Sequence, residues 1–143
     1  PADLFKYNTA VTTFANIFMN CNALESIPAD LFKYNTEVET FEGLFLNCAI
    51  TSIPSGLFDY TPDVVFFNGA FQGCTFLTAI PAGLFNNNLV VEVFDYTFYG
   101  CIALTGNAPT LWLRDPAPAG THCFYGCTLL DNYGDIPSGW TAI

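Results

Sequence analysis

Apolar residues recur along this chain every three or four positions, and the same order of apolar and polar positions returns after 26 to 28 residues. From the first unit into the start of the second, these positions are Val11, Phe14, Phe18, Cys21, Leu24, Ile27 and Leu31. This spacing suits a coil of short arcs better than long strands or long helices. In the first unit we expect helical turns at 1–6 and 15–20 and short strands at 9–14 and 24–27. Equivalent strands of successive coils would stack in parallel, as two narrow ladders.

The repeat is visible directly in the sequence, because PADLFKYNT occurs at 1–9 and again at 28–36. In the register that this sets, one column of prolines is Pro1, Pro28, Pro54, Pro81, Pro109 and Pro137. Two aromatic columns are Phe14, Phe41, Phe67 and Phe94, and Phe18, Phe45, Phe71, Phe98 and Phe124. One unit cannot bury its own apolar face, so stacking of neighbouring units is expected to turn each column into a ladder inside a shared core.

Two segments carry a resemblance to a known family. FMNCNALESIPADLF is similar to the F-x-x-C-x-x-L-x-x-I-P-x-x-L core of BspA-like leucine-rich repeats, and VTTFANIFMNC resembles related repeats in lipoproteins and surface proteins of host-associated bacteria. The resemblance covers 1–108 and resumes at 123–130. It implies an α/β repeat solenoid of the leucine-rich-repeat kind, with about five coils of about 27 residues. It also implies an extracellular or cell-surface module for adhesion or recognition, binding a host or neighbouring-cell protein or glycan.

The register also predicts how the chain is organised. Residues 1–108 form four tandem repeats, and 109–143 form a degenerate fifth repeat and a C-terminal cap in which Trp112 and Trp140 close the core. In this last part the proline-rich segment LWLRDPAPAGTH replaces the strand. Because the chain begins inside a repeat, we expect further repeats upstream, and an uncapped N-terminal coil could associate end to end with another copy.

Charge narrows the classes of partner. The 143 residues include three basic and thirteen acidic ones, for a formal net charge of −10. Nucleic-acid binding needs a basic surface that displaces counterions from phosphates, so nucleic acid is not an expected partner. No apolar run approaches the ~18 residues of a membrane-spanning helix, so no membrane insertion is expected. Cationic partners and neutral polar partners such as glycans remain open.

The cysteines are expected to be structural. Five of the six share one column, Cys21, Cys48, Cys74, Cys101 and Cys127. Stacked side chains point the same way, which is poor geometry for disulfides, so we expect a ladder of buried, reduced thiols. With no C-x-x-C and a single histidine, His122, no metal site is expected. His122 and Cys123 are adjacent, but neighbours in an extended chain point to opposite sides, which argues against a thiol nucleophile.

The chain offers no other catalytic motif, so we expect neither an enzyme nor a cofactor. The candidate ligand site lies instead where the repeats differ from one another, since repeats keep their fold with fixed columns and tune recognition with free ones. Large apolar, aromatic and acidic residues occupy these variable columns at Val65, Phe66, Glu92, Val93, Asp95, Tyr96, Tyr99 and Tyr125. Exposed together, they would form an interaction patch.

Two alternatives stay open at this level. Irregular coils can tuck the variable residues inward, and the spacing does not tell which residue of each neighbouring pair faces solvent. A structural role, as a spacer or assembly repeat such as part of a phage tail or fibre, is the alternative to recognition. A further column, Tyr7, Tyr34 and Tyr60, becomes Asn87 in the fourth unit, and we interpret it as structural.

Overall fold

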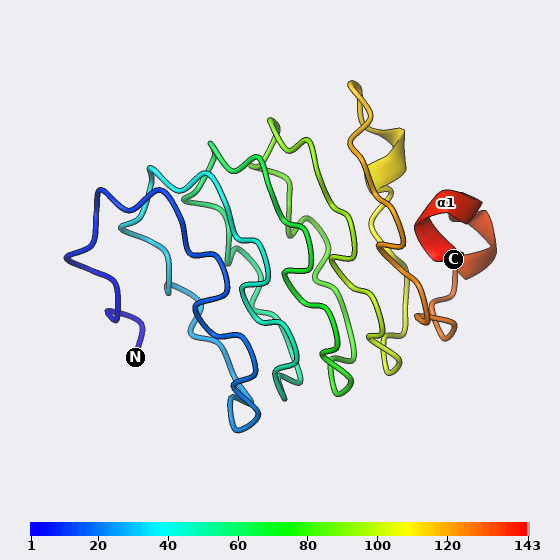
Figure 1. Ribbon diagram of the computed structural model, residues 1–143, viewed down its shortest axis with the longest axis horizontal. Coiled ribbons are helices and arrows are strands. Elements are labelled where there is room, and N and C mark those ends of the chain that lie inside the picture. The colour runs from blue at the N-terminus through cyan, green and yellow to red at the C-terminus, as the bar shows by residue number, and fades with distance from the viewer. Residues whose placement is uncertain (143) are drawn as a thin grey trace.

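In the computed structural model, which describes residues 1–142, the chain winds through successive coils that stack side by side along one long axis, with the two termini at opposite ends (Figure 1). Its helical elements all lie in the last third of the chain. They are the 3₁₀ helices η1 (Leu111–Leu113) and η2 (Tyr133–Asp135) and the short α-helix α1 (Ser138–Thr141). Within residues 1–142, no helix is both long enough and apolar enough to cross a membrane.

The predicted strands are reduced to single bridges. One residue per coil pairs in parallel with the next coil, along the line Thr13, Thr40, Phe66, Val93 and Ala119. The expected strand at 24–27 and its equivalents form no bridge. They contribute one backbone hydrogen bond per coil, such as Thr78 N to Thr51 O at 3.3 Å and Thr105 N to Thr78 O at 2.9 Å. The prediction of short strands was therefore wrong in detail, because the backbone enters turns two residues after each bridge residue.

We expected a helical turn at 15–20. In the structure, successive backbone N–H groups of this segment donate alternately to the next coil and to the same coil. The amides of Asn16, Phe18 and Asn20 donate to carbonyls of the next coil at 2.7 to 3.1 Å. The amides between them donate within the coil, as Ile17 N does to Phe14 O and Met19 N to Asn16 O. Helical hydrogen bonding would consume all of these donors locally. The alternating pattern instead satisfies the backbone and ties each coil to its neighbour.

This alternation requires two left-handed residues in every coil, four positions apart. The first column holds Asn16, Gly43, Gly69, Tyr96 and His122, and the second holds Asn20, Asn47, Gly73, Gly100 and Gly126, all at positive φ. Glycine and asparagine are the residues that tolerate this conformation best, so eight of these ten positions follow the ordinary preference. Tyr96 (φ 57°) and His122 (φ 53°) are the exceptions.

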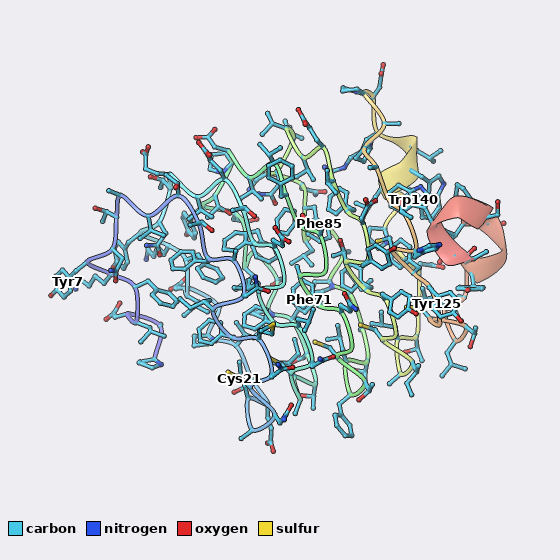
Figure 2. All side chains as sticks on the ribbon, viewed as in Figure 1. Tyr7, Cys21, Phe71, Phe85, Tyr125 and Trp140 are labelled. Carbon is cyan, nitrogen blue, oxygen red and sulfur yellow. The ribbon has the colours of Figure 1, made fainter. Side chains whose placement is uncertain are left out.

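Stacked phenylalanine rings fill the space between the two sides of the coils (Figure 2). Phe71 is fully buried, and its ring centroid lies 5.7 Å from that of Phe45 and 5.3 Å from that of Phe98. Phe85 packs edge-on against Phe94 at 5.0 Å, which joins two of the aromatic columns. Aromatic pairs at such distances stabilise the core beyond the area that they bury.

A polar column, not singled out from the sequence, runs inside the core. The Asn35 side-chain amide donates to the carbonyls of Phe5 and Asn8 in the preceding coil, and Asn88 does the same to Phe58 and Thr61. In the last coil the guanidinium of Arg114 takes this place. It donates to Asn88 O and Phe85 O, both at 2.8 Å, so the only arginine of the chain acts in packing one coil onto the next.

The helix α1 covers the last coil. Its Gly139 and Trp140 carbonyls accept the N–H groups of His122 and Phe124 at 2.9 and 2.8 Å, which are the groups that a following coil would bind. Gly120 stands after the bridge residue Ala119, where earlier coils have a phenylalanine. The Trp140 ring occupies the space that a side chain at Gly120 would need.

Candidate functional site

A shallow groove crosses three coils on the side that carries the bridges. It has a volume of about 420 Å³ and is lined by Glu42, Phe66, Asn68, Val93, Asp95 and Tyr96. Four of these six residues were predicted as site residues from the variation among the repeats. They are Phe66, Val93, Asp95 and Tyr96. The groove therefore brings together part of the expected patch, and we call it the bridge groove below.

The apolar part of the bridge groove comes from the line of bridges. Phe66 and Val93 pair with one another in adjacent coils, so their side chains stand next to each other on one face. Phe66 is 41% exposed, whereas its neighbour Val65 is half-buried. Glu92 is exposed, but neither it nor Val65 lines the groove. The structure thus decides which member of each neighbouring pair faces the groove.

The polar part is one column of three coils, Glu42, Asn68 and Asp95. Each follows the inward phenylalanine of its coil by one residue, so each side chain turns outward again. One oxygen of Asp95 accepts the Thr121 N–H at 2.6 Å, which fixes the carboxylate at the groove wall. A second hollow of about 220 Å³ shares Glu42, Asn68 and Tyr96 with the bridge groove, so the two lie side by side.

Four aromatic side chains continue the surface toward the C-terminal end. Tyr96 lies 5.7 Å from Tyr99 and 5.3 Å from His122, measured between ring centroids. Tyr99 stacks on Tyr125 at 4.8 Å with nearly parallel rings, and Figure 2 places Tyr125 near the C-terminal end of the stack. This aromatic cluster includes both bulky residues that the chain holds at positive φ.

The backbone conformation of Tyr96 is unusual for its residue type. A bulky side chain in the left-handed region costs roughly 1–2 kcal/mol, whereas asparagine and histidine adopt this region more readily. The chain meets the same backbone requirement with Asn16, Gly43 and Gly69 at no such cost. Strained residues of this kind concentrate at functional sites, because selection for the side chain outweighs the strain.

Sequence reasoning does not assign Glu42, Asn68 or His122 to the site. Glu42 and Asn68 share a column with Asp95, so comparison along that column would find them. The sequence suggests His122 only as a neighbour of Cys123. No spacing rule indicates that its ring lies 6.5 Å from that of Tyr125.

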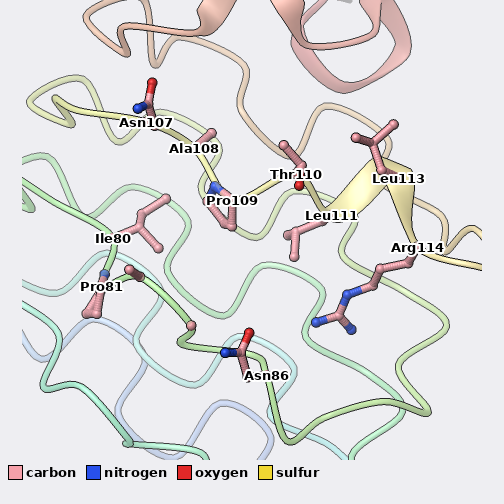
Figure 3. Close-up of a pocket in the computed structure, with 12 residues that line it drawn as sticks. Ile80, Pro81, Asn86, Asn107, Ala108, Pro109, Thr110, Leu111, Leu113 and Arg114 are labelled. Atoms are coloured by element: carbon pink, nitrogen blue, oxygen red, sulfur yellow. The ribbon is translucent and has the colours of Figure 1, made fainter.

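A larger hollow than the bridge groove lies elsewhere, between the turn at 80–86 and the segment at 107–114 that includes η1. It has a volume of about 700 Å³ and is wide open to solvent. Figure 3 shows Ile80 and Pro81 on one side and Leu113 and Arg114 on the other. The Arg114 guanidinium already donates to two backbone carbonyls and lies 5.3 Å from the Phe94 ring. Since its one charged group is engaged in the fold, we do not assign a ligand to this hollow.

The cysteine column forms a ladder of free thiols along the inside of the coils. Each thiol from the second coil onward donates to the carbonyl of a phenylalanine in the preceding coil. The first two bonds are Cys48 Sγ to Phe18 O at 3.0 Å and Cys74 Sγ to Phe45 O at 3.1 Å, and Cys101 and Cys127 repeat the contact. Cys21 is the half-buried member of the column.

The thiols have little nucleophilic character in this environment. Burial raises the pKa of Cys74 and of Cys127 to about 12, and it raises the pKa of Cys123 as well. A thiol with a raised pKa stays protonated and reacts poorly. Cys123 is fully buried, whereas the ring of His122 faces the surface tyrosines. Among residues 1–142, no three potential ligands gather as a metal site would require.

Comparisons with known proteins add little. No protein family and no curated protein matches the sequence. A solved structure of the APL1 leucine-rich repeat domain is similar with a TM-score of 0.37 and 14% identity, over 74% of this chain and 34% of that one. The leucine-rich repeat domain of APL1B gives 0.28 and 12%, over 71% and 36%. This chain spans about a third of those domains, and a similarity this slight carries no argument. Its description as a leucine-rich-repeat-like solenoid rests on its own coils.

Proposed function

We propose that this chain is a non-catalytic recognition module of a surface or secreted protein, with repeats of the BspA-like kind in about five coils of about 27 residues. It binds a protein or glycan of a host or neighbouring cell through the bridge groove and the adjoining aromatic cluster. The proposal combines the family resemblance of the repeats with the position of the groove in the columns that vary most from coil to coil.

One observation carries the proposal. Phe66 and Tyr96 are 41% and 39% exposed and line the same groove, and Tyr96 sits where the other coils place asparagine, glycine or histidine. Exposed aromatic side chains beside polar groups are typical of recognition surfaces, because they supply contact area and few rotamers to immobilise. Neither side chain belongs to the buried core.

The experiment is a binding screen of the purified chain against extracellular-matrix proteins, mucins and a glycan array. The test variant is Phe66→Thr/Tyr96→Asn, which uses residues that the chain itself places at Thr40 and Asn16 in the same columns. The matched control is Tyr34→Asn/Tyr60→Asn, which removes two exposed tyrosines on another edge and imitates Asn87. We expect saturable binding that the test variant loses and the control keeps.

Two results would contradict this proposal. Equal loss of binding in the test and control variants would show that the groove is not the site. Absence of binding to every member of the panel, with normal folding of the chain, would favour a structural spacer or assembly repeat, for example part of a phage tail or fibre.

A further inference from the structure

The face around the bridge groove carries acidic residues and no basic ones. Its outward columns contain Glu39, Glu42, Glu92 and Asp95. The three basic residues of the chain lie elsewhere. Lys6 Nζ lies 5.8 Å from the Tyr7 ring centroid and Lys33 Nζ lies 6.0 Å from that of Tyr34, while Arg114 binds backbone carbonyls. Carboxylates on one face without counter-charge repel one another, and a cationic partner relieves that repulsion.

The groove also has the dimensions of a short extended peptide. Glu42 and Asp95 occupy the same column two coils apart, with Asn68 between them. Neighbouring strand-like coils are spaced by about 4.8 Å, which puts the two column positions about 10 Å apart. A polyproline II segment advances about 3.1 Å per residue and turns fully in three, so side chains i and i+3 project to the same side about 9 Å apart.

The remaining walls fit an arginine better than a neutral sugar. Phe66, Val93 and Tyr96 provide apolar and aromatic surface beside the carboxylates, and a guanidinium can pair with a carboxylate while its plane lies against a ring. Tyr99 and Tyr125 stack on each other, so each ring covers one face of the other. A neutral glycan can hydrogen-bond to the carboxylates but leaves their charge uncompensated, whereas a guanidinium forms charge-assisted hydrogen bonds and neutralises it.

We propose that the bridge groove recognises an extended, cationic protein segment with arginines three residues apart, one at Glu42 and one at Asp95. The Asp95 oxygen that does not bind Thr121 N–H is available to the ligand, since among residues 1–142 it accepts no hydrogen bond. This inference rests on the proposed recognition function and specifies its partner. Asn68 lies between the two carboxylates and can bind the peptide backbone.

The test is fluorescence anisotropy with the full chain and the fluorescein-labelled peptide Arg-Ser-Ser-Arg-Ser-Ser-Arg. A peptide of the same composition with the arginines adjacent reports on spacing, and a lysine version reports on the guanidinium. The groove variant is Glu42→Gln/Asp95→Asn, in which position 95 imitates Asn68. The control is Glu37→Gln/Asp63→Asn, which removes the same charge from exposed positions outside the groove.

We expect the spaced peptide to bind more tightly than the adjacent one. The groove variant should weaken it about five- to tenfold, as the loss of two exposed ion pairs would, and the control should change it less than about twofold. Binding should also weaken at high salt. Equal weakening in both variants, or no preference for spacing, would overturn the inference and show nonspecific attraction to an acidic protein.

The outcome also separates this inference from the recognition function itself. If the peptide fails to bind but a glycan or host protein binds and Phe66→Thr/Tyr96→Asn abolishes that binding, recognition stands and the cationic partner is wrong. If neither the peptide nor any member of the panel binds to a folded chain, both proposals fail.

Discussion

The thiol ladder predicts that the protein loses stability in mildly alkaline solution. Burial raises the pKa of Cys74 and Cys127 to about 12, against an ordinary value of 9.0. The folded state therefore keeps these protons where the unfolded chain releases them. Because the folded state binds more protons above pH 9, the free energy of unfolding falls as the pH rises from about 9 toward 12, and it is unaffected by these groups below that range.

The magnitude follows from the size of the shift. Each pH unit above 9 costs about 1.4 kcal/mol per thiol until the folded pKa is reached. At pH 10 the two thiols together cost about 3 kcal/mol, which for a chain of this length lowers the melting temperature by roughly 10 °C. Burial also raises the pKa of Cys48, Cys101 and Cys123, so they add to the loss.

The assay is urea unfolding followed by circular dichroism at pH 7, 8, 9 and 10, with a reducing agent present. The comparison is the variant Cys74→Ala/Cys127→Ala. This variant should be less stable than the native chain at pH 7, because two backbone carbonyls lose their thiol donors. Its free energy of unfolding should decline less steeply between pH 9 and 10. If the variant and the native chain lose the same free energy over this interval, or if neither loses any, the assignment of buried, protonated thiols is wrong.

Three further predictions concern the core and its cap. Phe71→Ala removes a fully buried ring from the middle of an aromatic column and should cost about 3–5 kcal/mol in urea unfolding, and a cost below about 1 kcal/mol would refute the stacking. In the native chain at pH 8, Ellman's reagent should react quickly with Cys21 alone, and the five buried thiols should react only on unfolding. Fast reaction of several thiols would contradict the ladder. Arg114→Ala should destabilise the chain by about 2–4 kcal/mol, because Phe85 O and Asn88 O lose charged donors, and calorimetry showing an unchanged melting temperature would contradict this.

The repeat period and the identity of the inward-facing side chains could be read from the order of residues. Hydrophobic periodicity reports burial, so the columns of Phe71 and Cys74 follow from the order of residues alone. The variable columns also selected Phe66, Val93, Asp95 and Tyr96, which the structure brings into one groove.

Tertiary structure alone decided how the backbone satisfies its hydrogen bonds. The predicted strands and helical turns became single bridges and alternating turns, because the donors are shared between one coil and the next and no local propensity encodes that division. The same holds for Arg114, which takes the place of an asparagine in the polar column of the last coil. It holds also for Tyr96 and His122, because the left-handed backbone that aims their rings at the surface is imposed by the neighbouring coils.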